Sequence, residues 1–234
     1  LFCCDDYVIT WSPTSDDDWD IIAVIEEMQS NAPAKAKEEI ESATRSELRN
    51  QVSVTFTQKV AEYVGRPALD MAVHISKGLV EVPYDLFQQR LPAQEWGIEL
   101  DHYLGGEVKI YETDEQGRAV RQLERMVLSP FPVVDIENKL TNNDMTKVEV
   151  IEYAEDHATV FWRVMYSNNN STETDVGSVD FRAYNDSSTL VTFHSAHRLN
   201  APGGIHVPND LLRIALKMTF GDFIAHYRKL VEGK

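Results

Sequence analysis

The sequence of 234 residues has only two cysteines, Cys3 and Cys4, which are adjacent near its N-terminal end. Adjacent cysteines cannot cross-link distant parts of a fold, and they do not provide a cysteine-rich metal motif. Cysteine usage therefore excludes a disulfide framework and leaves the redox compartment open.

Positive charge is also scarce, because 22 lysines and arginines stand against 38 acidic residues, a formal net charge of −16. Affinity for a phosphate backbone comes from Lys and Arg side chains that displace counterions. A nucleic-acid partner is therefore not expected, and we interpret the dispersed acidic residues as a solvated surface.

Apolar residues make up 43% of the chain and charged residues 26%, which is ordinary for a globular protein. This composition does not fit a disordered or a membrane-spanning protein. We expect one main core and a soluble protein, cytoplasmic rather than secreted or lipid-anchored. No transmembrane segment is expected, although transient contact with a membrane is compatible with the sequence.

Common catalytic motifs are missing too. The chain has no P-loop, dinucleotide fingerprint, Ser-His-Asp signature or cysteine nucleophile. Of the seven histidines, His194 and His197 lie three residues apart on a predicted strand. They should therefore point to opposite faces, and they cannot both ligate one ion without a bulge. We expect neither a metal nor another cofactor.

The first part of the chain has a helical pattern. Residues 15–29 place aspartates before apolar positions at helical spacing, which is typical of a capped amphipathic helix. A polar helical stretch follows over 33–51, and residues 52–65 either continue it or break it with a β-branched run. We expect residues 1–73 to be an N-terminal helical extension and residues 74–234 to be the main domain.

From about residue 74 the pattern changes to that of strands. A strand ending at Pro83 leads into a short helix over 84–92 and a second helical or irregular piece over 93–100. Alternation of apolar and polar residues then predicts six more strands, at 107–114, 118–129, 147–155, 157–167, 174–184 and 188–199. Their short polar connections imply antiparallel neighbours.

The last element is predicted to be one long helix that begins near Asn209. Its apolar stripe contains Leu212, Ala215, Leu216, Thr219, Phe220, Phe223, Tyr227 and Leu230. Such a helix needs a partner surface, and the antiparallel sheet is the only large one that the sequence predicts.

This order of elements resembles the START-like helix-grip superfamily, also called SRPBCC, over roughly residues 74–232. Three stretches carry the resemblance: "EVPYDLFQQRLPAQEW", "GSVDFRAYNDSSTLVTF" and "VPNDLLRIALKMTFGDFIAHYRKL". The superfamily includes lipid-transfer domains, Bet v 1-like plant allergens and polyketide cyclase/aromatases. The resemblance implies an α+β fold, in which a curved seven-stranded antiparallel sheet wraps around the C-terminal helix and leaves a ligand cavity. It also implies a loop over the cavity mouth, at Gly203 and Gly204.

Strand alternation then predicts which side chains face that cavity. In "HATVFWRVMYS" the positions of Trp162 and Tyr166 share one face, and in "SVDFRAY" Phe181 lies on the face opposite Asp180. We predict that an apolar cavity is surrounded by Trp162, Tyr166, Phe181, Phe193, Phe220, Phe223 and Tyr227.

Glu124 and Arg125 are neighbours on a predicted strand, so one of them can point inward. A buried charge is costly unless it is paired, so an inward charge would be a ligand anchor or half of an internal ion pair. The alternative is a register in which both residues lie at the edge of the sheet in water.

An apolar interior without a catalytic set favours a binding or carrier domain for a hydrophobic small molecule, such as a lipid, sterol, polyketide or aromatic metabolite. The alternative is an enzyme of the polyketide cyclase, aromatase or dehydratase kind, in which acid/base groups act on a ligand held in the same cavity. A third alternative is a protein-interaction module that uses the acidic N-terminal helices.

Overall fold

The computed structural model describes the chain between residues 9 and 233, apart from 64, 98–102, 129–142, 169–171, 202–204 and 222. Cys3, Cys4, Gly203 and Gly204 therefore lie outside the described residues. None of the described helices is both long and apolar enough to cross a membrane.

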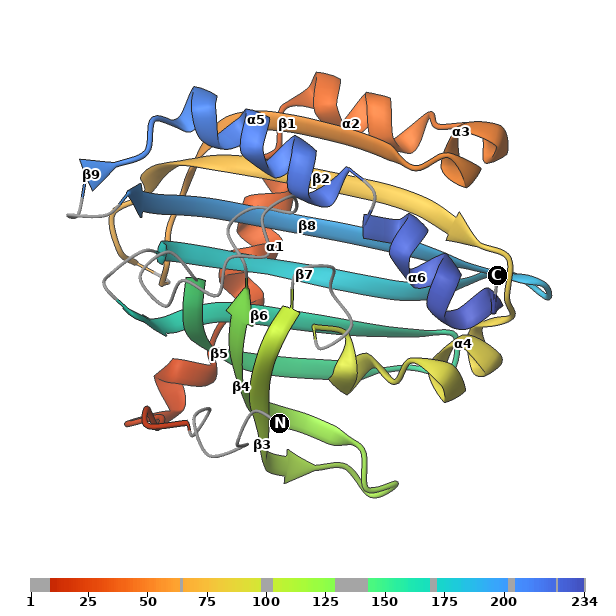
Figure 1. Cartoon of the computed structure of the whole chain (residues 1–234), viewed down its shortest axis with the longest axis horizontal. Helices are drawn as coiled ribbons and strands as arrows, with labels where there is room; N and C mark the ends of the chain where they lie inside the picture. The colour runs from red at the N-terminus through yellow and green to blue at the C-terminus, as the bar shows by residue number, and fades with distance from the viewer. Residues whose placement is uncertain are drawn as a thin grey trace.

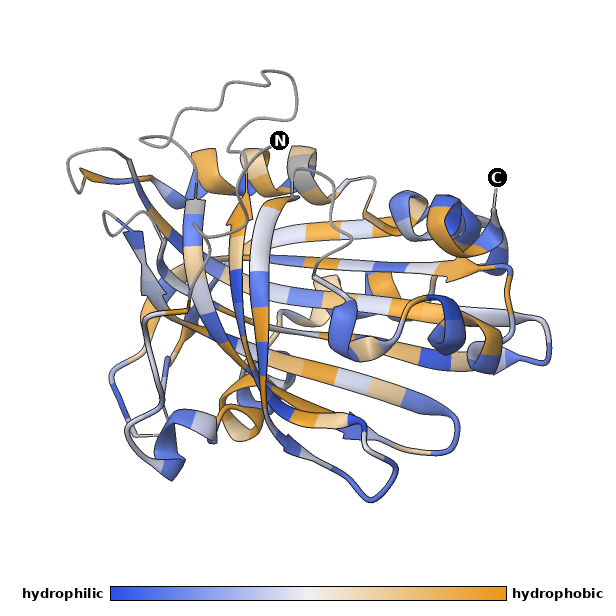
Figure 2. Cartoon of the chain, turned by 60° about the horizontal axis from the view of Figure 1, so that its bottom comes forward, coloured by the Kyte–Doolittle hydropathy of each residue, from blue (hydrophilic) through white to orange (hydrophobic). Residues whose placement is uncertain are grey.

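The centre of the molecule is one antiparallel sheet in the order β1-β2-β8-β7-β6-β5-β4-β3, with a short β9 beside the end of β8. The strands are β1 Val52–Val60, β2 Leu69–Val80, β3 Tyr103–Thr113, β4 Ala119–Leu128, β5 Asn143–Tyr153, β6 His157–Ser167, β7 Thr172–Asn185, β8 Ser188–Ala201 and β9 Ile205–His206. The sheet curves strongly, so that β3 and β4 run steeply across the direction of β2, β8 and β7 (Figures 1 and 2).

Helices cover both faces of this sheet. Helices α5 Asn209–Phe220 and α6 Phe223–Glu232 lie across β2 and β8 on what we call the inner face (Figure 1). Helix α1 Ile22–Ser30 packs against the opposite, outer face. The remaining helical elements are η2 Asp16–Trp19, α2 Ala34–Glu41, α3 Arg45–Arg49, α4 Tyr84–Arg90 and η3 Ala93–Glu95.

The predicted α+β class and the antiparallel sheet are confirmed, and the six predicted strands correspond to β3 through β8. The strand count is nine rather than seven, because residues 52–60 form β1 and residues 205–206 form β9. Of the two alternatives for residues 52–65, the structure shows the one in which the β-branched run breaks the helix. The boundary predicted between residues 73 and 74 falls inside β2, which pairs through its residues 69–77 with the whole of β1.

The C-terminal helix, predicted as one element, is divided at Gly221 into α5 and α6. The side chain of Gln51 bridges the break, since its Nε2 donates to the carbonyl of Phe220 at 2.8 Å and its Oε1 accepts the N–H of Ile224 at 2.9 Å. Gln51 has a φ of 62°, a left-handed conformation that is uncommon for a residue other than glycine. A residue about 170 positions away therefore satisfies backbone groups that the break leaves free.

Candidate functional site

The inner face of the sheet carries a cluster of aromatic side chains beneath α5 and α6. Six of the seven residues predicted to line a cavity lie in or against it: Trp162, Phe181, Phe193, Phe220, Phe223 and Tyr227. The ring centroid of Phe193 lies 4.7 Å from that of Phe223, 4.9 Å from that of Phe220 and 5.4 Å from that of Trp162. Such distances mean direct ring contact. The structure therefore brings the six residues together, and their contact with a ligand stays a prediction.

Tyr166 does not join this cluster, and its predicted inward position is wrong. Its side chain is 49% exposed. The pairing of β5 with β6 shifts between Val164, which faces Lys147, and Tyr166, which faces Thr146. This irregularity inserts one extra residue, so Tyr166 no longer shares a face with Trp162. A bulge of this kind cannot be seen in the alternation of the strand itself.

A second feature of the inner face is a buried ion network on β4 and β5. Lys147 Nζ lies 2.5 Å from a carboxylate oxygen of Glu124 and 3.1 Å from one of Glu149, and all three side chains are at most 2% exposed. Glu149 also accepts hydrogen bonds from Trp96 Nε1 at 3.0 Å and from Gln122 Nε2 at 2.7 Å. Of the alternatives for Glu124, the internal ion pair is the one that the structure shows.

This network is electrostatically unusual. Burial raises the pKa of Glu124 to about 8, against the attraction of Lys147. Burial alone would lower the pKa of Lys147, but Glu124 and Glu149 outweigh it and hold this pKa above its usual value. The two shifts are therefore linked, because Lys147 lowers the pKa of Glu124 and Glu124 raises that of Lys147. A side chain at Gly97 would come within 2.6 Å of both Glu124 carboxylate oxygens, so the chain covers this carboxyl group closely.

A third feature is a chain of polar side chains beneath Phe220. Asp175 accepts a hydrogen bond from Trp162 Nε1 at 3.0 Å and lies 3.5 Å from His197 Nδ1. His197 Nε2 is 2.7 Å from the hydroxyl of Ser195, and on β2 His74 Nε2 is 2.6 Å from Ser76 Oγ. Burial lowers the pKa of His197, and it lowers that of His74 to about 3. Both rings are therefore neutral near pH 7.

The order Asp175, His197, Ser195 matches that of an acyl-transfer triad, but three observations point to a structural role. Ser195 has no exposed surface. The His74–Ser76 pair repeats the His–Ser geometry on the neighbouring strand. The Asp–His distance of 3.5 Å is also long for a hydrogen bond that would orient an imidazole.

The prediction that His194 and His197 face opposite ways is confirmed. The His197 ring stacks on Phe220 at the inner face, whereas His194 pairs across from Ile75, which belongs to the outer core. Within the described residues, no three or more His, Cys, Asp and Glu side chains are arranged to hold a metal ion.

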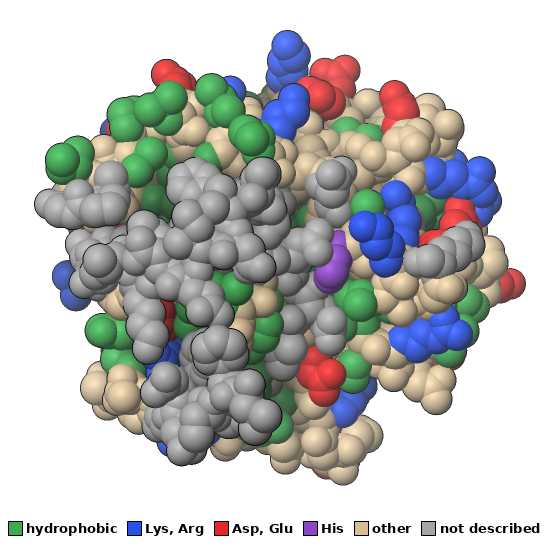
Figure 3. Space-filling view, viewed as in Figure 1, with side chains coloured by type: hydrophobic (Ala, Val, Ile, Leu, Met, Phe, Trp, Pro, Cys, Tyr) green, Lys and Arg blue, Asp and Glu red, His purple; other side chains and the backbone are tan. Residues whose placement is uncertain are grey.

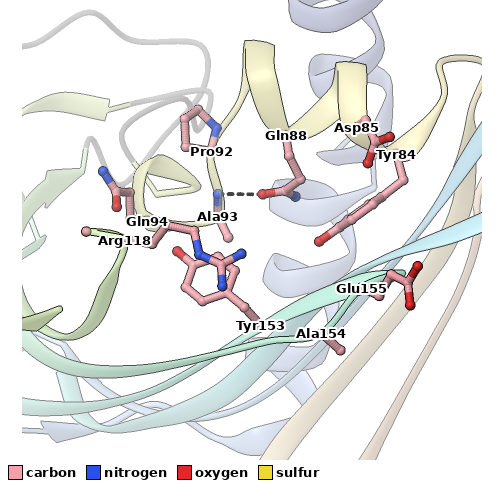
Figure 4. A pocket seen from close by; sticks show the side chains of 11 residues that line it. Tyr84, Asp85, Gln88, Pro92, Ala93, Gln94, Arg118, Tyr153, Ala154 and Glu155 are labelled. Atoms are coloured by element: carbon pink, nitrogen blue, oxygen red, sulfur yellow. Dashed lines mark hydrogen bonds between the residues drawn. The ribbon is translucent and has the colours of Figure 1, made fainter. Parts of the chain in front are cut away.

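Apart from these buried features, the structure shows an open pocket of about 540 Å³ at one end of the sheet. It lies between α4, the η3 segment and the two turns that join β3 to β4 and β5 to β6 (Figure 4). None of the predicted lining residues belongs to it.

The sequence did not predict the roles of Lys147, Glu149, Trp96 and His74. Lys147 and Glu149 alternate with Val148 and Val150, a pattern that normally assigns the charged positions to water. Here α1 and η2 cover the valine face, so the charged positions lie in the interior. Only the knowledge that both faces are covered would have identified them.

Comparison with known proteins gives the fold. No family model matches the chain, and no curated protein has a significantly similar sequence. Human StAR-related lipid transfer protein 5 superposes with a TM-score of 0.56 at 11% identity, over 90% of this chain and 94% of that one.

Two further structures align with lower TM-scores. A START superfamily protein from Mycobacterium smegmatis has a TM-score of 0.49 at 12% identity, over 69% of this chain and 97% of that one. The Zhui aromatase/cyclase from Streptomyces sp. R1128 has a TM-score of 0.45 at 14% identity, over 78% and 92%. The sheet order, the covering C-terminal helices and the similarity to the human protein together show that the chain has the START-like helix-grip fold.

Proposed function

We propose that the protein binds and carries a hydrophobic small molecule between the inner face of the sheet and helices α5 and α6. The observation that carries this proposal is the composition of that face, where an aromatic cluster adjoins a buried Glu124–Lys147–Glu149 network. Buried charges cost several kcal/mol in desolvation, so the packing of a core does not explain why they are there. A ligand with an apolar body and one polar group would contact the aromatic cluster with its body and the ion network with its polar group.

The joint between α5 and α6 offers a route for ligand entry. Backbone hydrogen bonds of the helix are interrupted there, and the side chain of Gln51 replaces them. Gln51 also donates to the hydroxyls of Ser53 and Ser76 at 3.0 and 3.1 Å. Movement of α5 about this joint would carry Phe220 away and uncover Phe193 while leaving α6 in place.

The outer surface of α5 supports exchange at a lipid surface. Leu211, Ile214 and Met218 are between 60% and 71% exposed, and they follow each other by three and four residues on the helix. The space-filling view shows hydrophobic side chains gathered over the position of α5 (Figure 3). An apolar helix face of this kind binds at a membrane interface in proportion to its buried area.

The test is to purify the full chain and measure it by native mass spectrometry, which detects a bound small molecule. That molecule is then extracted and identified. Transfer of a fluorescent lipid between vesicles is then measured for the wild type and for Met218→Asp. Lys59→Gln, at an exposed position of β1, is the control that also lowers the net charge by one. We expect a retained hydrophobic molecule and slower transfer in Met218→Asp only. Absence of a retained molecule together with no transfer would contradict the proposal.

A cyclase, aromatase or dehydratase activity is the second candidate, and the raised pKa of Glu124 favours it. A carboxyl group that keeps its proton near neutral pH can act as a general acid toward a ligand held beside it. Glu124→Gln keeps the shape and removes this proton source. Conversion of a linear polyketide precursor by the wild type and its loss in Glu124→Gln would establish catalysis, whereas unchanged recovery of the precursor from the wild type supports carriage.

A further inference from the structure

The open pocket at the end of the sheet contains polar groups that the proposed carrier function does not use. Tyr84, Asp85 and Gln88 come from α4, Arg118 from the turn before β4, and Tyr153 and Glu155 from the end of β5 and the turn after it. Figure 4 shows the side chains of Tyr84, Gln88, Arg118 and Tyr153 pointing toward one common space. A volume of about 540 Å³ lies within the range of pockets for small molecules.

Gln88 presents a donor with no partner. Its Oε1 accepts the N–H of Ala93 at 3.1 Å, which fixes the orientation of the amide. Its Nε2 is buried and makes no hydrogen bond within the described part of the chain. A buried donor without a partner is costly, and a small movement of the amide toward the pocket would let a ligand oxygen satisfy it.

Two tyrosine hydroxyls add groups that can both donate and accept. Burial raises the pKa of Tyr84 to about 12 and that of Tyr153 to about 12. Both hydroxyls therefore keep their protons at any physiological pH. Each can give one hydrogen bond to a ligand oxygen and accept one from a ligand hydroxyl.

The charges of the pocket do not favour an ionic ligand. The guanidinium group of Arg118 lies 4.0 Å from the centroid of the Tyr153 ring, and its Nε is 2.7 Å from the Asp114 carboxylate. Asp85 and Glu155 bring two more carboxylates to the lining. An anion would meet an arginine that is already paired and further negative charge, whereas a cation would meet the guanidinium group.

We propose that this pocket binds an uncharged molecule rich in hydroxyl groups, such as a sugar or a cyclic polyol. Each hydroxyl of such a molecule both donates and accepts, so it matches the donors Gln88 Nε2 and Arg118 and the two tyrosine hydroxyls. The same chemistry is present in a free sugar and in the sugar head group of a glycolipid.

Saturation-transfer NMR on the full chain tests the proposal. The probes are the methyl glycosides of glucose, galactose and mannose, and myo-inositol, with citrate and choline as charged probes. We expect saturable binding of at least one hydroxylated probe and none of citrate or choline. Preferred binding of citrate or choline, or no saturable binding of any hydroxylated probe, would overturn it.

Variants locate the binding. Tyr84→Phe combined with Tyr153→Phe removes two hydroxyls and keeps both rings, and we expect roughly tenfold weaker binding from the loss of two hydrogen bonds. Gln88→Glu keeps the acceptor for Ala93 and removes the amide donor, so it should also weaken binding. Tyr184→Phe, at a tyrosine on β7 outside the pocket, is the matched control and should bind as the wild type does. Unchanged binding in the double variant would overturn the assignment to this pocket.

A comparison of vesicles with and without a monoglucosyl lipid separates the two sources of the sugar. Recruitment of the full chain only by the glycolipid vesicles, and its loss in the double tyrosine variant, assigns the pocket to a lipid head group. Binding of the methyl glycosides without such recruitment assigns it to a free sugar. Neither result depends on a ligand beneath α5 and α6, so the failure of either proposal can be recognised separately.

Discussion

The two faces of the sheet are both buried, yet they differ in chemistry. The outer face is a mostly aliphatic core in which Val73, Ile75, Val148 and Val176 pack against Ile25 and Met28 of α1. The inner face combines aromatic rings with the buried charges of Glu124, Lys147 and Glu149. Along β5 the charged residues of the inner face alternate with the aliphatic residues of the outer face. The outer face also buries the charged side chain of Arg163, which donates to the backbone carbonyls of Glu62 and Asp18. The inner face differs because it buries a group of interacting acidic and basic side chains beside aromatic rings, which is the observation behind the proposed ligand site.

The largest expected effect comes from breaking the inner ion network. Lys147→Ala leaves two buried carboxyl groups without their cation, and removal of one partner of a buried pair typically costs about 3 to 5 kcal/mol. We expect a loss of this size in the free energy of unfolding, measured by urea titration. Lys59→Ala, at an exposed position of β1, is the control and should change stability by less than about 0.5 kcal/mol. A loss below about 1 kcal/mol for Lys147→Ala would mean that the network is not buried as described.

The outer face should respond in stability alone. Met28 is 2% exposed, and Met28→Ala should cost about 2 to 5 kcal/mol through the cavity that it leaves. Binding of a fluorescent apolar probe, measured under conditions where the variant stays folded, should be unchanged. Weaker probe binding in this variant would place the ligand on the outer face and reverse the comparison.

Acidification should affect the inner face through His74. The pKa of His74 is lowered to about 3 in the folded protein, so its contribution to stability is present above the unfolded pKa of about 6.5 and is lost as pH falls below it. Between pH 7.5 and pH 5 this single group should cost about 2 kcal/mol. The free energy of unfolding of His74→Asn should therefore fall by about 2 kcal/mol less than that of the wild type over this range. Parallel curves for the two proteins would show that His74 is protonated in the folded state.

The smallest expected change in stability is at the predicted ligand site. The Phe223 ring lies 4.7 Å from both Phe193 and Tyr227, and in a dense core Phe223→Ala would cost about 3 to 5 kcal/mol. If the space beneath α6 opens for a ligand, we expect a modest loss of stability and at least about tenfold weaker binding of the apolar probe, equivalent to about 1.4 kcal/mol. A large melting loss with unchanged probe binding would mean that α6 only packs the core.

Much of the fold could be predicted because it depends on local alternation. Strands β6, β7 and β8 match the predicted ranges closely. The alternation of side chains along β6 and β7 correctly assigned Trp162 and Phe181 to the buried interior. The helices at the N-terminal end are more broken than predicted, since residues 15–29 form η2 and α1, and residues 33–51 contain α2 and α3. Their caps and turns, such as the capping box between Thr44 and Glu47, are local features that the broad helical pattern concealed.

The sequence by itself determined which residues form strands and which side chains share a face, because backbone geometry makes side chains alternate along any strand. Only the tertiary structure decided what covers each face. Contacts between residues far apart in the chain placed Lys147 and Glu149 in the interior, and they placed Gln51 at the break between α5 and α6. The bulge that turns Tyr166 outward is likewise a property of the pairing between β5 and β6. These features depend on partners from other parts of the chain, so no local pattern could reveal them.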